Sequence, residues 1–266
     1  MPYEYGFPKY VSVAEKRARA ERSLANLRKK NPDIAPVVVI GRKLTNTWWG
    51  KAWNDNLERY SDYAYRIGRG KSYVRHGAVL DLQIAPGKVS ALVQGSEDKP
   101  YRIQITIQPL SNNTWENTKR SCEGAIESLQ ELLNGQFPKS LADLFTAEGT
   151  GLFPMPKEIA LQCSCPDWAS MCKHVAAALY GVGTRLDENP LLFFVLRKVN
   201  IDDLISKTIA QKSATLLKKS IHKSDRVMDS DDISAMFGID LEEDNETASA
   251  EDAARKPIRP RSKKKP

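Results

Sequence analysis

Three cysteines and one histidine fall within a dozen residues of each other, and this cluster constrains the fold more than any other feature of the chain. They are Cys163, Cys165, Cys172 and His174, in a C-x-C-x6-C-x-H pattern. Three thiolates and one imidazole form a ligand set typical of a tetrahedral structural zinc site. The whole chain has only four cysteines and three histidines, so most of its soft metal ligands are in this segment. The pattern predicts one bound zinc ion.

The spacing also predicts the local structure. Side chains alternate along an extended segment, so Cys163 and Cys165 point to the same side. Pro166 and Asp167 then favour a turn. The last two ligands come just before, or within, the first turn of an apolar helix expected over 175–180. We therefore expect a β-turn-α unit with the metal at the junction.

Other interpretations explain the cluster less well. Buried cysteines often serve as small apolar residues, but that accounts for one or two of these residues and not for four together. A disulfide would leave one of the three cysteines unpaired. Met1–Tyr5 shows no secretory signal, so we expect a cytoplasmic protein in a reducing environment, where metal is favoured over disulfides.

The ligand set also favours a structural over a catalytic role. A catalytic zinc keeps an open position and has a general base nearby. Here four ligands close the shell, and the nearest acids are Glu158 and Asp167, of which Asp167 fits a turn. The sequence has no H-E-x-x-H helix. We therefore expect a non-catalytic protein, and the hypothesis of a metal-dependent hydrolase is set aside.

The cluster and the apolar helix after it resemble the SWIM-type zinc finger, which has the form C-x-C-x(n)-C-x-H. Further segments resemble the N-terminal region of bacterial SWIM zinc finger proteins, namely Trp48–Trp53, Arg69–Gly77, Val93–Ser96 and Pro100–Tyr101. The resemblance implies an association with Swi/Snf-type helicases and binding of DNA or protein by the finger. The chain has no G-x-x-x-x-G-K-[ST] loop, so it is not the ATPase itself.

Hydrophobic patterns predict an α+β fold with an N-terminal antiparallel sheet. The clearest strand is 101–108, where Ile103, Ile105 and Ile107 alternate with polar residues. Further strands are expected over 36–40, 78–84, 89–94 and 158–163. Helices are expected from the Ser12–Glu15 capping box to about Lys30, from Thr47 past Leu57, and over 115–133, 140–145, 190–199 and 202–211. For the tryptophans near position 50, core packing is favoured over stacking on nucleic-acid bases.

We divide the chain into five parts. They are a basic N-terminal helix or arm (1–35), an α+β domain with an antiparallel meander (36–148), a small ββα-like zinc finger (149–185), a helical C-terminal region (186–240) and a disordered acidic-then-basic tail (241–266).

Positive charge is concentrated in patches rather than spread evenly. The net charge is +7, and residues 42–75 hold eight Lys and Arg against three acids. Arg66, Arg69, Lys71 and Arg75 alternate there with tyrosines, which suits phosphate contact and base stacking. A solvated charged loop whose tyrosines anchor in the core fits equally well, and both interpretations stay open. No apolar run is long enough to cross a membrane.

These observations lead to two hypotheses. The first is a non-catalytic zinc-binding protein that contacts nucleic acid, with DNA as the expected partner, and that assists a Swi/Snf-type helicase. The alternative is an interaction adaptor that docks such an ATPase and has no nucleic-acid contact of its own.

Overall fold

The computed structural model describes residues 11–204 except 124, 127, 168 and 170, and for residues 61–66 it describes the backbone only. All of these residues belong to one compact unit, Met1–Ala214. The tail over 241–266 and most of the helix expected over 202–211 lie outside the described residues. The division of the chain into five parts stays a prediction.

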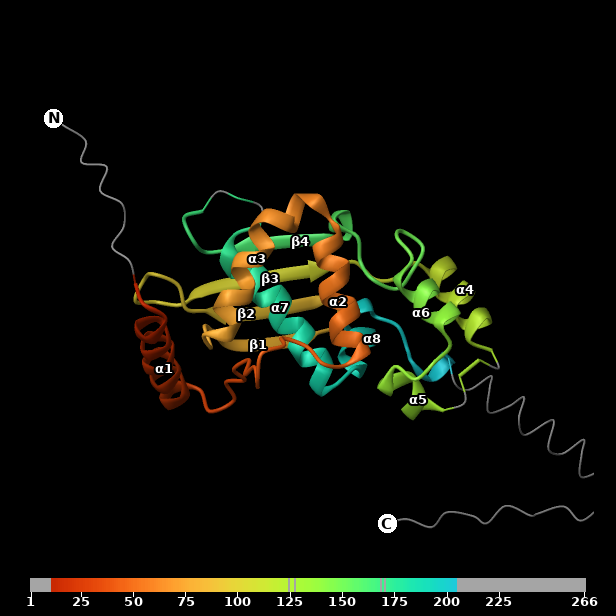
Figure 1. The fold of residues 1–266 in the computed structure, drawn as a ribbon, viewed down its shortest axis with the longest axis horizontal. Coiled ribbons are helices and arrows are strands. Elements are labelled where there is room, and N and C mark those ends of the chain that lie inside the picture. The colour runs from red at the N-terminus through yellow and green to blue at the C-terminus, as the bar shows by residue number, and fades with distance from the viewer. Residues whose placement is uncertain (1–10, 124, 127, 168, 170, 205–266) are drawn as a thin grey trace, which may run out of the picture. The chain divides into compact units, whose positions relative to one another are not determined.

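One antiparallel sheet is present in the described part of the chain, with the strand order β1-β2-β3-β4 (Figure 1). Its strands are β1 (Val79–Ala85), β2 (Lys88–Val93), β3 (Tyr101–Ile107) and β4 (Ile159–Cys163). The alternation predicted for β3 is confirmed, since Ile103, Ile105 and Ile107 are buried and the residues between them are exposed. The fold is α+β, as expected.

Helices precede the sheet in the chain, separate its third and fourth strands, and follow it. They are α1 (Val13–Lys30), α2 (Trp48–Arg59), α3 (Ser61–Arg75), α4 (Asn112–Cys122), α5 (Leu129–Asn134), α6 (Lys139–Thr146), α7 (Lys173–Glu188) and α8 (Leu191–Arg197), with a 3-10 turn at Pro156–Glu158. The capping box of Ser12 and Glu15 starts α1 as predicted. Thr47 caps α2 by accepting a hydrogen bond from the Gly50 amide.

Helix α7 is the central helix of the described unit. It lies on one face of the sheet and packs against α2 and α3 (Figure 1). Almost all of its residues are buried, including Ala176, Ala177 and Ala178. A helix that is apolar on nearly every side is stable only inside a core. The elements around α7 therefore depend on its position.

The tryptophans of α2 are part of the core. Trp49 and Trp53 have no exposed surface. Their indole N–H groups donate to the carbonyl oxygens of Leu132 and Leu179, each at 2.9 Å. Core packing is thus confirmed for these two residues, and neither can stack on a base.

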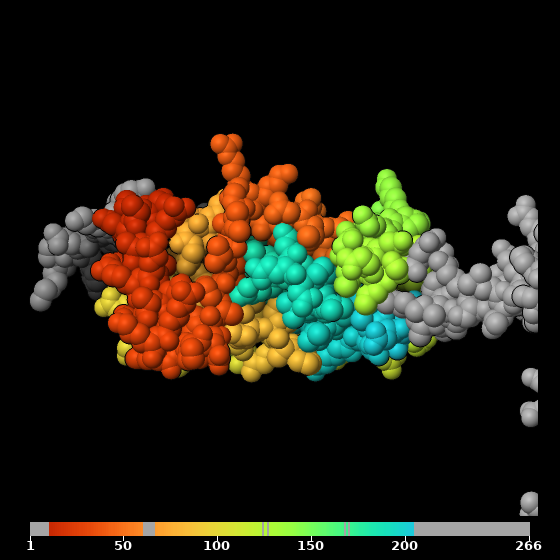
Figure 2. Space-filling view, turned by 90° about the horizontal axis from the view of Figure 1, so that it is seen from below, coloured from red at the N-terminus to blue at the C-terminus, as the bar shows by residue number. Residues whose placement is uncertain are grey.

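The prediction of a strand over 36–40 is wrong. The Val37 amide donates to the Val79 carbonyl, and the Ala35 carbonyl accepts from Leu82. The segment thus touches the β1 edge, but Pro36 has no N–H to continue a ladder. α1 and this segment lie beside the β1 side of the sheet (Figure 2).

Two further predictions about helical segments also need correction. The expected helix over 115–133 is two helices, because Ser128 caps α5 by accepting from the Glu131 amide. The basic segment after Arg59, considered as a loop, is helix α3.

Candidate metal centre

Two of the predicted ligands are at the start of α7. Cys172 is the N-cap residue, and its Sγ accepts a hydrogen bond from the Val175 amide at 3.4 Å. A helix N-terminus stabilises a thiolate, because its unpaired N–H groups and the helix dipole favour negative charge. His174 follows in the first turn and is 3% exposed. The helix thus presents both ligands at a fixed spacing.

The other two ligands come from the end of β4 and the segment after it. Cys163 is the last residue of β4 and pairs with Ile103 of β3, so its side chain lies on the buried face of the sheet. The pairing extends one residue further, because the Ser164 amide donates to the Arg102 carbonyl at 3.0 Å. The Asp167 carboxylate then accepts from the Ala169 amide, as in the predicted turn.

The four ligand atoms converge on one point. They all lie within 4.8 Å of one another, and Cys172 Sγ is 3.8 Å from His174 Nδ1. Tetrahedral zinc, with bonds of about 2.3 Å to sulfur and about 2.0 Å to nitrogen, places its ligand atoms roughly 3.5–3.8 Å apart. The group of Cys163, Cys165, Cys172 and His174 is therefore positioned to bind a single zinc ion.

The ionisation of the thiols supports the same conclusion. The Cys163 thiol interacts with Cys172, which lowers the pKa of Cys172 and raises the pKa of Cys163. Only one of these thiols ionises readily, since like charges disfavour each other at this distance. A bound cation removes that competition, and its binding releases protons. Cys122 is a separate case: it is buried in α4 outside this group, and burial raises its pKa to about 12.

Three residues far away in the sequence hold the His174 ring. The rings of Tyr101 and Tyr73 lie 4.5 and 5.4 Å from it, centroid to centroid. A Cβ atom added at Gly95 would be 2.8 Å from His174 Nε2, so this nitrogen faces the glycine while Nδ1 faces the thiols. Nε2 is buried and has no hydrogen-bond partner among the described residues. Sequence reasoning missed this role, although all three residues lie in segments that resemble other SWIM proteins.

Comparison with known families agrees with this geometry. Residues 151–182 match the family model of the SWIM zinc finger. This segment is a SWIM zinc finger. The match covers β4, the ligand loop and the first part of α7, so the finger shares a strand with the sheet and a helix with the core.

One similar protein is known from Mycobacterium tuberculosis (strain ATCC 25618 / H37Rv), under the name "Uncharacterized protein Rv2102". It is 36% identical over 171 residues, which are 64% of this chain and 61% of that protein. The chain thus matches less than two thirds of the relative's length. No solved structure matches the chain.

The four residues predicted to contact nucleic acid all belong to α3, but their surroundings differ. Lys71 Nζ pairs with Glu58 Oε1 at 2.8 Å and lies 5.5 Å from the ring centre of Tyr180. Arg69 and Arg75 are exposed, and the Arg66 side chain lies outside the described part. Their role in binding stays a prediction.

Arg75 lines the same hollow as two other arginines that come from different elements. It lines a hollow of about 410 Å³ together with Arg17 of α1 and Arg42. This site joins segments that are far apart in the chain.

No helix in the described residues is both long and apolar enough to cross a membrane.

Proposed function

We propose that this protein is a non-catalytic SWIM zinc finger protein that binds nucleic acid, with DNA as the expected partner, and that it assists a Swi/Snf-type helicase in the cytoplasm. The observation that carries the proposal is a concentration of positive charge where α1, the segment at 41–42 and the end of α3 meet. The helicase association rests on the resemblance to bacterial SWIM proteins.

The hollow at this junction suits a polyanion. Arg17, Arg42 and Arg75 line it, and no acidic residue is among its described lining residues. Its surroundings are also positive: burial lowers the pKa of His76, and the charges of Lys16, Arg17 and Arg75 lower it further. Like charges that crowd together repel each other, and phosphates relieve the repulsion while they release counterions.

The metal centre supports a structural role for zinc. Its four protein ligands complete a tetrahedral shell, whereas a catalytic zinc keeps a position for water. When bound, the zinc would join the end of β4 to the start of α7. Because α7 packs against α3, the finger helps to position the helix that carries Arg75, and the basic residues contact the phosphates.

The test is DNA binding by the zinc-loaded full chain, measured by fluorescence anisotropy with short labelled duplexes of several sequences. Affinity should fall steeply as salt rises from about 50 to 200 mM. The triple variant Arg17→Gln, Arg42→Gln and Arg75→Gln should weaken binding to every sequence and reduce the salt slope by about 2–3.

A matched control removes three exposed lysines elsewhere, with Lys88→Gln, Lys139→Gln and Lys157→Gln. It should change the affinity much less than the arginine variant does. No binding by the wild-type protein at low salt would overturn the proposal.

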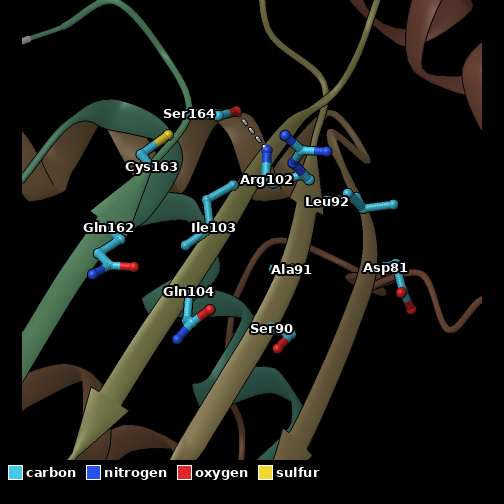
Figure 3. A pocket seen from close by; sticks show the side chains of 10 residues that line it. All are labelled: Asp81, Ser90, Ala91, Leu92, Arg102, Ile103, Gln104, Gln162, Cys163 and Ser164. Atoms are coloured by element: carbon cyan, nitrogen blue, oxygen red, sulfur yellow. Dashed lines mark hydrogen bonds between the residues drawn. The ribbon is translucent and has the colours of Figure 1, made fainter.

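One observation favours the alternative of an interaction adaptor. The outer face of the sheet carries exposed polar side chains in register, Ser90, Gln104 and Gln162, across β2, β3 and β4 (Figure 3). They line a shallow hollow of about 550 Å³, and the helices lie behind the sheet in this view. Asp81 and Arg102 also line this hollow, so it offers one charge of each sign beside uncharged hydroxyl and amide groups, which suits hydrogen bonds to a protein surface. If Gln104→Arg and Gln162→Arg abolish co-purification with a Swi/Snf-type ATPase while wild-type protein binds no DNA, the adaptor is the better account.

A further inference from the structure

A second basic hollow lies next to the zinc centre. It has a volume of about 330 Å³ and is formed by α1, the end of α3, the segment after β2 and the first residue of α7. Lys16, Arg19 and Lys173 supply its positive charge, and no acidic side chain is among its described lining residues. Lys173 directly precedes the ligand His174, so the finger itself provides one of the cations.

Two of the three cations of this hollow, Arg19 and Lys173, make contacts with other elements. Arg19 Nη1 donates to the carbonyl oxygen of Ser96 at 2.6 Å, which ties α1 to the loop between β2 and β3. Lys173 Nζ lies 5.8 Å from the ring centre of Tyr73. Because their positions are set by these contacts, less conformational entropy is lost when an anion binds.

The two hollows are lined by neighbouring residues of the same two helices, α1 and α3. Lys16 and Arg17 are consecutive residues of α1, and one lines each hollow. Arg75 and His76, at the end of α3, divide between the hollows in the same way. A single small anion would need one such site. Two basic hollows lined from the same helices suit contact with more than one phosphate of a chain.

The walls of the second hollow also fit part of a nucleotide. Val11, Tyr73 and Ala78 add apolar surface to its lining. Its volume is at the lower end of the range for small-ligand pockets. A sugar can pack against these walls while its phosphate meets the lysines.

We infer that this hollow receives one phosphate and its sugar from the nucleic-acid strand, so that the zinc finger takes part in the grip through Lys173. The inference rests on the proposed function and adds a second subsite to it. It also explains why the metal centre lies beside the basic surface: the zinc would hold the start of α7, and the start of α7 presents Lys173.

The experiment uses the zinc-loaded full chain and a short labelled DNA duplex of mixed sequence. The double variant Lys16→Gln and Lys173→Gln removes two cations and leaves polar, uncharged side chains that are one atom shorter. It should lower the affinity about tenfold at low salt and reduce the salt slope by about 2. The control, Lys88→Gln with Lys139→Gln, loses the same charge from exposed positions on β2 and α6 and should change the affinity by less than about twofold.

Two further measurements keep the result specific. Each variant is checked for one zinc per chain, and if Lys173→Gln loses metal, Lys16→Gln alone decides the question, because Lys16 is on α1 away from the ligands. The imidazole NMR signals of His76, which also lines the hollow, should shift when the duplex is added to the wild-type protein.

Equal affinity of the two double variants, or no shift of the His76 signals, overturns the inference and leaves the proposed function standing. Absence of any binding by the wild-type protein overturns the proposed function, and the inference with it. The two failures are therefore distinct.

Discussion

At the scale of single residues, the orientation of the His174 ring decides which nitrogen meets the metal. Nδ1 lies on the side of the thiols, 3.8 Å from Cys172 Sγ, and Nε2 lies against Gly95. The rings of Tyr73 and Tyr101 flank the imidazole. Mutation of residues that orient a ligand typically lowers metal affinity by about 10–100-fold.

This arrangement predicts the effect of Gly95→Ala. The new methyl group would collide with the Tyr101 ring and lie 2.8 Å from His174 Nε2, so the imidazole must shift or rotate from the position in which Nδ1 meets the thiols. Zinc affinity, measured by competition with a chromophoric chelator, should fall by about 10–100-fold. Gly68→Ala is the control, because a Cβ there meets no atom within 4 Å. Unchanged zinc affinity in Gly95→Ala would show that this contact does not orient the ring.

The four zinc ligands could be predicted from the sequence, but the residues that orient His174 could not. Cys163 and His174 are close in the chain, so their spacing alone restricts how they can meet. Gly95 and Tyr101 reach the site only through the pairing of β4 with β3, which no local pattern specifies. The same is true of Arg197, a buried cation that pairs with Glu158 at 3.1 Å.

At the scale of elements, α3 shows how glycine can hide a helix from sequence analysis. Gly68 and Gly70 lower the helix propensity of the segment by about 1 kcal/mol each. A Cβ atom at Gly70 would lie 2.6 Å from the backbone of Ala176, so this glycine lets α3 approach α7 closely. Tertiary packing thus outweighs local propensity.

The two glycines predict opposite effects on stability. Gly70→Ala forces α3 away from the α7 backbone and should lower the free energy of unfolding by about 1–3 kcal/mol. Gly68→Ala has open space and should raise it by roughly 0.5–1 kcal/mol, since alanine favours the helix. Urea unfolding of both variants measures the difference. Equal effects of the two substitutions would mean that the close approach is not needed.

The strands were more predictable than their neighbours. Ile103, Ile105 and Ile107 alternate with polar residues, and alternation depends only on local sequence. The apolar run over 36–40 misled because it is only partly buried: Val37 is in the core, but Val38 and Ile40 are 62% and 87% exposed.

At the scale of the whole described unit, the structure gathers charges that the sequence separates. Lys16 and Arg17 of α1, Arg75 of α3 and Lys173 of α7 line two neighbouring hollows. Charge counts along the chain marked both the N-terminal helix and 42–75 as basic, and Lys71 in the second segment pairs with Glu58. A surface assembled from several elements cannot be found by counting along one of them.

The zinc centre is also part of the whole unit rather than an appended finger. β4 pairs with β3 in the sheet, and α7 packs against α2, α3 and the strands. The metal site joins the end of β4 to the start of α7. Loss of one ligand should therefore affect the core as well as the ligand loop.

The most direct test of this account is X-ray absorption at the zinc edge of the purified full chain, with the zinc content measured on the same sample. We predict one zinc per chain, with three sulfur atoms at about 2.3 Å and one nitrogen at about 2.0 Å. A folded protein without zinc, or a zinc shell that includes a water oxygen in place of one of the four ligands, would contradict the closed structural centre on which the account depends.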